Sequence, residues 1–318
     1  MKYKDIVIVT GGAGFIGSNY LNKYVPRMKE RLFVNVDKLT YAGKLSNLSV
    51  AKAPNYAFEK VDICDMKALR KVFKKYHPTA VMHFAAESHV DLSIKDPDIF
   101  IRTNVLGTHN LLLLAREFRV GRFHQVSTDE VYGALKSRAG SFREDSPLQP
   151  RNPYSASKAA ADLLVRSYSE TFGLNTVITR SCNNYGPNQD TSKIIPSFLT
   201  KLFAGRSVPL YDRGQHIREW IYVEDCVDAL HLAFTKGKSG ETYNIGSGQE
   251  LTNLELTQLL LALTKRDSSF IRSVPNRLGH DFRYSLDSRK MRRLGWKPKV
   301  SLQEGLLRTA EALNNHEK

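Results

Sequence analysis

The chain has 318 residues, of which 42% are hydrophobic, so it can bury a sizeable core and is not globally disordered. Its formal net charge of +15 could attract nucleic acid, but no block of Lys and Arg is dense enough for a dedicated binding arm, and a nucleic-acid partner is not expected. The cysteines Cys64, Cys182 and Cys226 follow no metal-ligand spacing, so no metal is expected. There is no signal peptide and no apolar run of about 18 residues, which predicts a cytoplasmic protein outside the membrane.

In chain order, short β-branched runs alternate with amphipathic stretches through the first half of the sequence. The expected strands are Ile6–Thr10, Leu32–Asp37, Tyr56–Ile63, Ala80–Ala85, Phe123–Ser127 and Thr176–Ser181. The expected helices include Met66–Tyr76 and Thr103–Glu117. Strands that alternate with helices pair in parallel through right-handed crossovers. The sequence therefore predicts an α/β fold with a Rossmann-like doubly wound parallel sheet, which binds ligands outside the carboxyl ends of its strands.

The regularity of this pattern weakens after about Gly186. Shorter elements rich in Gly, Pro and Asn follow, for example Gly205–Pro209 and Ser273–Pro275. We expect a Rossmann domain over residues 1–186 and, mainly over 187–318, a smaller C-terminal substrate-binding lobe. Some segments of this second part are expected to return to the first domain.

A glycine motif, Gly11-Gly-Ala-Gly14-Phe-Ile-Gly17, follows the first expected strand and opens a helix. Glycine permits the turn and lets a pyrophosphate approach the backbone, where the helix N-terminus presents free N–H groups. Asp37 lies 20 positions after Gly17, at the end of the second strand, where a carboxylate can accept hydrogen bonds from both adenosine ribose hydroxyls and repel a 2′-phosphate. The joint pattern predicts NAD rather than NADP. The alternative is a glycine turn followed by a helix-capping Asp.

Further cofactor contacts are expected at the ends of the next two strands. Asp62 and Ile63 end the third, where a carboxylate can bond the adenine amino group, although a turn or cap role for Asp62 is an equal alternative. Ala85 and Ala86 end the fourth, where small residues let the chain pass beneath the ribose and phosphates.

A Tyr-x-x-x-Lys pair, Tyr154 and Lys158, opens a helical stretch after Pro153, and the spacing of four puts both side chains on one helix face. A lysine ammonium near a phenol favours the phenolate, so we expect the pKa of Tyr154 to be lowered. Upstream, Thr128-Asp129-Glu130 follows the strand Phe123–Ser127. A hydroxyl followed by two carboxyl groups supplies an acid and a base beyond what alcohol oxidation needs, which suggests an elimination coupled to that oxidation.

These residues make the chain resemble the extended short-chain dehydrogenase/reductases, and within them the nucleoside-diphosphate-glucose 4,6-dehydratases. The matching segments cover nearly the whole chain: Thr10–Gly17, Asp37–Gly43, Ala85–Asp91, Ser127–Gly133, Pro153–Lys158, Asn183–Pro187, Ile217–Asp225 and Thr242–Gly246. The Thr-Asp-Glu triplet is the specific part, because the related C4 epimerases usually carry a Ser-Ala-Thr-like string there.

The resemblance implies NAD-dependent conversion of dTDP-glucose or UDP-glucose to a 4-keto-6-deoxy sugar nucleotide, a step of deoxysugar biosynthesis such as that of rhamnose. Tyr154 would take the C4 hydroxyl proton with Thr128 hydrogen-bonded to the same oxygen, Glu130 would remove the C5 proton, and Asp129 would protonate the departing C6 hydroxyl. Asp129 must then be protonated and Glu130 ionised, so their surroundings must push the two pKa values apart. Family members are usually homodimers through a four-helix contact that includes the helix bearing Tyr154.

The resemblance also implies two sets of binding residues. The expected cofactor contacts are Gly11, Gly14, Phe15, Ile16, Gly17, Asp37, Lys38, Thr40, Asp62, Ile63, Ala85, Ala86, Ser88, Thr103, Tyr154, Lys158 and Asn184. The expected substrate contacts are Ser88, Thr128, Asn183, Lys193, Leu210, Tyr211, Arg218, Asn253, Arg277 and His280. Lys193 and Arg218 suit a diphosphate because they supply charge and donors.

The chain departs from the family pattern in two places. The segment after Pro187 usually reads like Tyr-x-Phe-Pro-Glu-Lys but is Asn188-Gln-Asp-Thr-Ser-Lys193 here, and the usual Asp-Arg-Pro-Gly-His string is Asn276-Arg-Leu-Gly-His280. Both lie in the nucleotide-facing lobe and leave the choice between thymine and uracil open. Two rival functions remain: a UDP-sugar 4-epimerase and, more distantly, an NAD-binding scaffold associated with nucleic acid.

Overall fold

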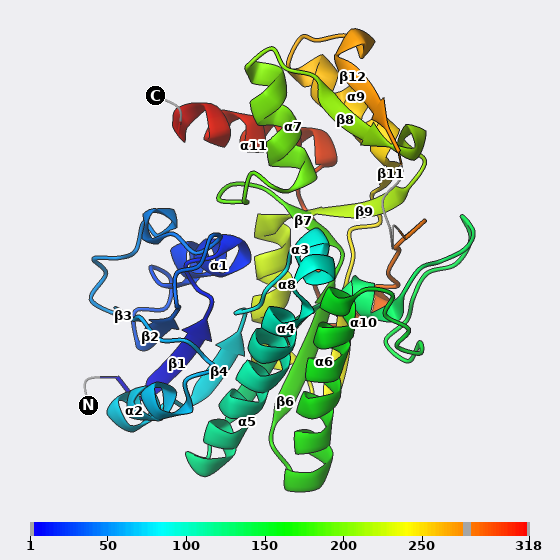
Figure 1. The fold of residues 1–318 in the computed structure, drawn as a ribbon. Coiled ribbons are helices and arrows are strands. Elements are labelled where there is room, and N and C mark those ends of the chain that lie inside the picture. The colour runs from blue at the N-terminus through cyan, green and yellow to red at the C-terminus, as the bar shows by residue number, and fades with distance from the viewer. Residues whose placement is uncertain (1–2, 276–280, 317–318) are drawn as a thin grey trace.

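The body of the protein is a parallel seven-stranded sheet with strand order β10-β6-β5-β4-β1-β2-β3 (Figure 1). The structure, a computed structural model, describes residues 3–275 and 281–316. The strands of this sheet are β1 (Asp5–Thr10), β2 (Arg31–Val36), β3 (Tyr56–Glu59), β4 (Ala80–His83), β5 (Arg122–Thr128), β6 (Thr176–Ser181) and β10 (Glu241–Ile245). Every pair in it is parallel, which confirms the Rossmann-like doubly wound class.

Helices cover both faces of this sheet and close two cores. The larger helices here are α1 (Phe15–Tyr24), α2 (Met66–Tyr76), α5 (Gly107–Glu117), α6 (Pro153–Phe172) and α8 (Val223–Lys236). Leu21 of α1 and Leu230 of α8 share one core with β1, while Phe73, Leu111 and Val165 of α2, α5 and α6 share the other. The short helices α3 (Val90–Lys95) and α4 (Pro97–Phe100) pack against α6, and α10 (Arg289–Arg293) packs against β10.

Several expected elements end differently in the structure. Helix α2 spans the expected residues, since Leu69, Val72 and Phe73 form one buried face and Asp65 caps its first turn. The expected strand Tyr56–Ile63 is too long: β3 ends at Glu59, and the Asp62 side chain instead accepts a hydrogen bond from the Cys64 N–H in a turn. The strands β2 and β4 likewise end one and two residues before Asp37 and Ala85.

The expected helix Thr103–Glu117 is divided. A π-helical turn, Ile101–Leu106, precedes α5, and it buries Thr103 and Asn104 against the rest of the molecule. Such turns are rare and occur frequently at functional sites. A π-helical segment of six residues is too short for its hydrophobic period to be recognised in the sequence.

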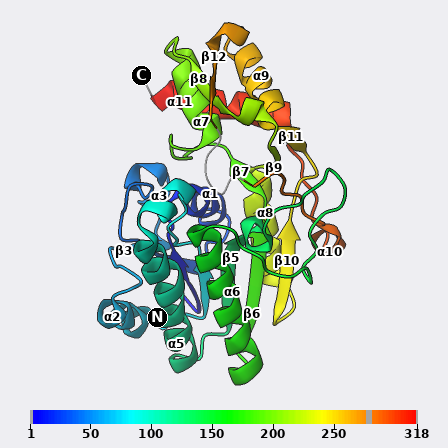
Figure 2. The same ribbon diagram turned by 45° about the vertical axis from the view of Figure 1, so that its right-hand side comes forward.

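A second, smaller group of elements packs around its own core of apolar side chains and lies above the carboxyl edge of the large sheet (Figure 2). It contains β7 (Asn183–Tyr185), β8 (Val208–Tyr211), β9 (Ile217–Tyr222), β11 (Glu250–Thr252), β12 (Ile271–Val274), α7 (Ile194–Phe203), α9 (Asn253–Leu263) and α11 (Leu302–His316). Strand β9 lies between β7 and β11, and β12 pairs with β8. Between these elements in sequence, α8 packs against the large sheet and β10 forms one of its edge strands. We propose that the boundary between the two domains lies at residue 186.

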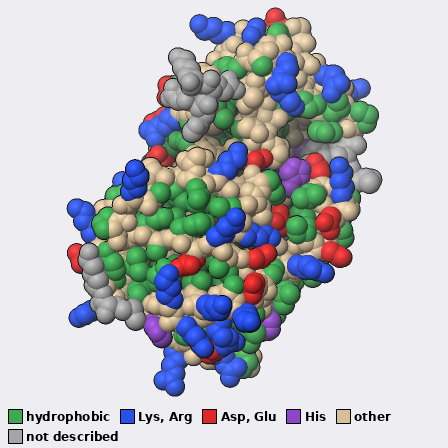
Figure 3. Space-filling model, turned by 60° about the vertical axis from the view of Figure 1, so that its left-hand side comes forward, with side chains coloured by type: hydrophobic (Ala, Val, Ile, Leu, Met, Phe, Trp, Pro, Cys, Tyr) green, Lys and Arg blue, Asp and Glu red, His purple; other side chains and the backbone are tan. Residues whose placement is uncertain are grey.

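The surface carries its excess positive charge in a dispersed form. Figure 3 shows Lys and Arg side chains spread over one face, among hydrophobic side chains and Asp and Glu. Several cations have acidic partners, for example Lys75 with Glu59 at 2.7 Å and Lys23 with Asp228 at 2.6 Å. Within residues 3–275 and 281–316, no helix has the length and apolar character needed to cross a membrane.

Candidate active site

The glycine motif folds into a tight loop between β1 and α1. Gly11 has a φ of +69°, and a Cβ there would lie 2.6 Å from the backbone nitrogen of Ala85. A Cβ on Gly17 would lie 2.3 Å from the carbonyl oxygen of Gly11. Gly14 is the N-cap of α1 and offers no side chain to its free N–H groups. The loop is therefore a cradle that suits a phosphate group at a helix N-terminus.

Asp37 closes the other side of this cradle. Its carboxylate accepts hydrogen bonds from the N–H groups of Ala13 at 3.0 Å and Leu39 at 2.9 Å. These bonds hold the side chain in place and leave lone pairs on both oxygens for further donors. Asp37 therefore anchors the loop in addition to being a candidate ribose ligand. The sequence alone indicates the ribose role but not the anchoring role.

A cavity of about 220 Å³ runs from the glycine loop along the carboxyl ends of β1, β2, β4 and β5. Every expected cofactor residue except Asn184 lines it. Asn184 instead donates to the Ser181 hydroxyl and the Cys182 carbonyl, and its cofactor role stays a prediction. The sequence did not point to Tyr41, Glu87, Val126 or Gln189, which also line this cavity.

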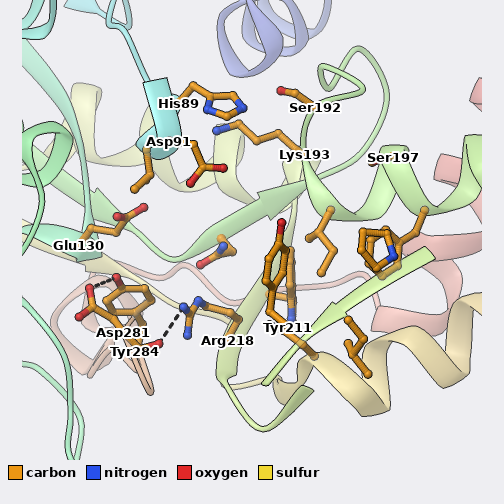
Figure 4. Close-up of a pocket in the computed structure, with 18 of the residues that line it drawn as sticks. His89, Asp91, Glu130, Ser192, Lys193, Ser197, Tyr211, Arg218, Asp281 and Tyr284 are labelled. Carbon is orange, nitrogen blue, oxygen red and sulfur yellow. Dashed lines mark hydrogen bonds between the residues drawn. The ribbon is translucent and has the colours of Figure 1, made fainter. Parts of the chain in front are cut away.

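A second cavity of about 340 Å³ lies between the large sheet and the smaller lobe (Figure 4). Among the expected substrate residues, it is lined by Asn183, Lys193, Leu210, Tyr211, Arg218 and Asn253. Ser88 lines the first cavity, Thr128 lines neither, and Arg277 and His280 fall outside the described residues. Lys193 lines both cavities and donates to the Ser88 carbonyl at 2.8 Å, so the two cavities meet at this side chain.

Arg218 is held rigidly in the second cavity. Its guanidinium donates to the carbonyls of Ile217 at 2.7 Å and Asp281 at 2.9 Å, and lies 4.5 Å from the centre of the Tyr284 ring. Figure 4 shows Arg218, Asp281, Tyr284 and Glu130 close together at one end of the cavity, with Ser197 toward the other. A fixed cation at this position suits a diphosphate.

The triplet forms a single helical turn at the carboxyl end of β5. Thr128 caps the turn by accepting a bond from the Glu130 N–H, and its hydroxyl donates to the Asp129 carboxyl at 3.2 Å. Asp129 is 2% exposed, whereas the Glu130 carboxyl reaches the larger cavity. The turn therefore separates the two acids into a buried one and a cavity-facing one.

Their surroundings treat the two acids differently. Burial, the Glu130 carboxylate and that of Glu219 raise the pKa of Asp129 well above its usual range. Burial also raises the pKa of Glu130, but Lys193, Arg218 and a hydrogen bond from Asn152 oppose that shift. The nearby cations thus favour ionised Glu130, whereas burial and the neighbouring carboxylates favour protonated Asp129.

Tyr154 and Lys158 lie on the first turns of α6, which begins with a capping box at Asn152. Lys158 donates to the Val126 carbonyl of β5 at 2.8 Å, and the side chains of Tyr154 and Lys158 both line the smaller cavity.

The expected lowering of the Tyr154 pKa is wrong for this structure. Burial and the neighbouring carboxylates raise the pKa of Tyr154, and a hydrogen bond with Thr128 opposes that shift. Burial in turn lowers the pKa of Lys158 to about 8, so the same desolvation disfavours charge on both groups.

The sequence did not single out several polar residues of the site. Asn152 donates to Glu130 at 3.5 Å, and its Asn-Pro-x-Ser capping pattern was a usable signal. His89, Asp91, Asp281 and Tyr284 line the larger cavity without a comparable signal. Asn104 in the π-helical turn donates to Ser157 of α6 at 2.8 Å and so braces the helix that carries Lys158. Within the described residues, no group of His, Cys, Asp and Glu could hold a metal ion.

Comparison with known proteins defines the class of this site. Residues 8–309 match the family model described as GDP-mannose 4,6 dehydratase. A dTDP-glucose 4,6-dehydratase of Haemophilus influenzae is 45% identical, with 96% of each chain covered. A dTDP-glucose 4,6-dehydratase of Streptomyces venezuelae, solved with NAD and DAU bound, is 45% identical with a TM-score of 0.94, covering 98% of this chain and 97% of that one. A UDP-glucose 4-epimerase of Thermotoga maritima is 31% identical with a TM-score of 0.92, covering 98% of this chain and 100% of that one.

The chain belongs to the nucleotide-sugar 4,6-dehydratases of the extended short-chain dehydrogenase/reductase family. The epimerase shares the fold at lower identity, so the fold alone does not separate the two activities.

Replacing Gly17 with Ala should distort the phosphate cradle, because the new methyl group would overlap the Gly11 carbonyl. We expect a lower melting temperature and loss of NAD binding, measured by calorimetry and by nucleotide released on denaturation. Gly14→Ala is the control, since its Cβ would meet that carbonyl at 3.3 Å and cost less stability. Equal melting temperatures for the two variants would contradict the cradle geometry.

Proposed function

We propose that the protein is an NAD-dependent 4,6-dehydratase that converts dTDP-glucose to the 4-keto-6-deoxy sugar nucleotide and water. The observation that carries this proposal is the turn at the end of β5, which holds a buried acid, Asp129, beside a cavity-facing acid, Glu130. A C4 epimerase has no use for such a pair. The names of the relatives support dTDP-glucose as the substrate, with UDP-glucose as the alternative.

The two cavities divide the binding of cofactor and substrate. The cradle at Gly11, Gly14 and Gly17 fits the NAD pyrophosphate, and Asp37 fits the adenosine ribose. Lys193 and Arg218 fit the diphosphate of the sugar nucleotide in the larger cavity. When bound, NAD supplies a reversible hydride acceptor.

The residues around the junction of the cavities then move the protons. Tyr154 takes the proton of the C4 hydroxyl, and Thr128 hydrogen-bonds the same oxygen. The resulting carbonyl acidifies the C5 proton, which Glu130 removes, while Asp129 gives its proton to the departing C6 hydroxyl. Asp129 has the raised pKa that an acid needs at neutral pH.

We also infer a homodimer and a cytoplasmic location. Ile101, Leu106 and Leu163 are 51%, 46% and 54% exposed on the π-helical turn and α6, which pack against one another. An apolar surface of this kind suits a helix-to-helix contact with a second copy. The cysteines of the described residues are all free, as is usual in a reducing compartment.

Purified protein should produce an alkali-sensitive 4-keto chromophore from dTDP-glucose without added NAD, because the reaction regenerates its own oxidant. UDP-glucose in a parallel reaction measures the base preference. Epimerised sugar nucleotide with no keto product would overturn the proposal, and faster turnover of UDP-glucose would reassign the substrate.

Replacing Glu130 with Gln should block dehydration more than oxidation, since the amide keeps the shape but cannot accept the C5 proton. In a single turnover, NADH absorbance should rise and persist, and hydrogen–deuterium exchange at C5 should disappear. Normal exchange at C5 in this variant would remove Glu130 from the role of base.

Replacing Tyr154 with Phe should slow C4 oxidation by about 10²–10⁴-fold, the usual contribution of a general base. Substrate affinity should change little, because the diphosphate contacts remain. The matched variant Asp129→Asn should still oxidise C4 but lose water from C6 slowly. If NADH formed at the normal rate in Tyr154→Phe, that side chain would not be the proton acceptor.

A further inference from the structure

A buried polar chain lies behind the proton-transfer pair and touches neither cavity. Asp162 of α6 is 1% exposed, and its carboxylate accepts a hydrogen bond at 2.9 Å from the Arg180 guanidinium of β6. Arg180 also donates to the Tyr132 hydroxyl at 2.9 Å, and Tyr132 donates to Asn244 of β10 at 2.8 Å. The first member of the chain, Asp162, stands four residues after Lys158 on the same helix.

Burial of the Asp162–Arg180 ion pair costs free energy. An ion pair loses its hydration on burial, and apolar residues of similar volume are often at least as stabilising. One carboxyl oxygen of Asp162 has no hydrogen-bond partner, so the pair does not satisfy even its own polar atoms. A contribution to fold stability alone is a weak explanation for it.

Lys158 is the group whose protonation the Asp162 carboxylate can favour. Its side chain is 4% exposed, and the Val126 carbonyl is the acceptor that the structure gives it. Asp162 and Tyr154 face it on its own helix, His83 lies near it on β4, and Arg180 lies beyond Asp162 on β6. Among these groups Asp162 is the one with a carboxylate side chain, and it lies one helical turn from Lys158 on α6.

We propose that Asp162, held in place by Arg180, is a positioning residue whose negative charge keeps Lys158 protonated for its work beside Tyr154. The role of Lys158 rests on the proposed function, whereas the charge coupling does not. Burial lowers the pKa of Lys158 to about 8 and Asp162 opposes this, so without the carboxylate the lysine loses its proton at a lower pH. Activity that requires protonated Lys158 is present below that pH and is lost as the pH rises through it.

The test is to replace Asp162 with Asn and titrate Lys158 in the holoenzyme. Lysine labelled with ¹³C at the ε carbon reports each ammonium by NMR, and Lys158→Arg assigns the signal. We expect the Lys158 titration in Asp162→Asn to move down by about one pH unit. The alkaline limb of NADH formation from bound dTDP-glucose should move in the same direction.

Two further variants keep the outcome decisive. Tyr132→Phe removes the Arg180–Tyr132 and Tyr132–Asn244 bonds but leaves the Asp162 charge, and it should titrate as the unaltered protein does. If Asp162→Asn does not fold, the double variant Asp162→Asn with Arg180→Gln leaves no unpaired buried charge and should still move the Lys158 titration down.

An unchanged Lys158 titration in a folded Asp162 variant would overturn the proposal, as would an equal shift in Tyr132→Phe. If the NMR shift appears but no nucleotide sugar is oxidised, the charge coupling holds and the proposed function fails. The two ideas are therefore tested separately.

Discussion

The hydrogen bond from Lys158 to the Val126 carbonyl joins α6 to β5, and the arrangement of the site depends on that junction. Strand β5 lies between β4 and β6 inside the parallel sheet, so its direction and register are fixed on both sides. Its carboxyl end must then emerge at the same edge as the glycine loop. The acid pair therefore stands beside Tyr154 because of sheet pairing and one helix-to-strand contact.

Burial imposes a common electrostatic condition on these groups. Asp129, Tyr154 and Lys158 are each nearly inaccessible, and desolvation disfavours the charged form of all three. Burial raises the pKa of Glu130 as well, but its carboxyl faces Lys193 and Arg218 across the cavity, and these cations oppose the shift. The desolvated interior of the site thus favours neutral Asp129 and Tyr154, while the cationic side chains of Lys193 and Arg218 line the larger cavity.

The sequence predicts the fold class, the phosphate loop and the Tyr154–Lys158 pair because each depends on local spacing. Gly11 to Gly17 is a loop motif, and Tyr154 and Lys158 are one helical turn apart. Prediction from the sequence fails for properties that depend on tertiary contacts. The Tyr154 pKa depends on packing and on carboxylates from another segment, and the early end of β3 depends on a turn made by the Asp62 side chain.

Long-range partners are also invisible to spacing. Asp162 and Arg180 are 18 residues apart on a helix and a strand, and neither stands in a recognisable motif. Arg218 and Tyr284 come together because Ile217 and Arg283, the residues beside them, form a backbone bridge across 66 positions of sequence. Pattern analysis finds groups that carry chemistry, while the groups that tune their charge emerge from the packed structure.

The edge strand β10 has a consequence for how the protein is made. Within the described residues it pairs with β6 alone, and together with α8 it completes one of the two cores of the large sheet. Both α8 and β10 arrive more than 40 residues after β6 in the chain. During synthesis, β6 therefore leaves the ribosome with one side unpaired and one face of the sheet uncovered. Such an edge is a template for pairing with another chain. A fragment ending at residue 186 would keep that exposed edge permanently, so we expect such a fragment to associate with other chains more readily than the whole protein does.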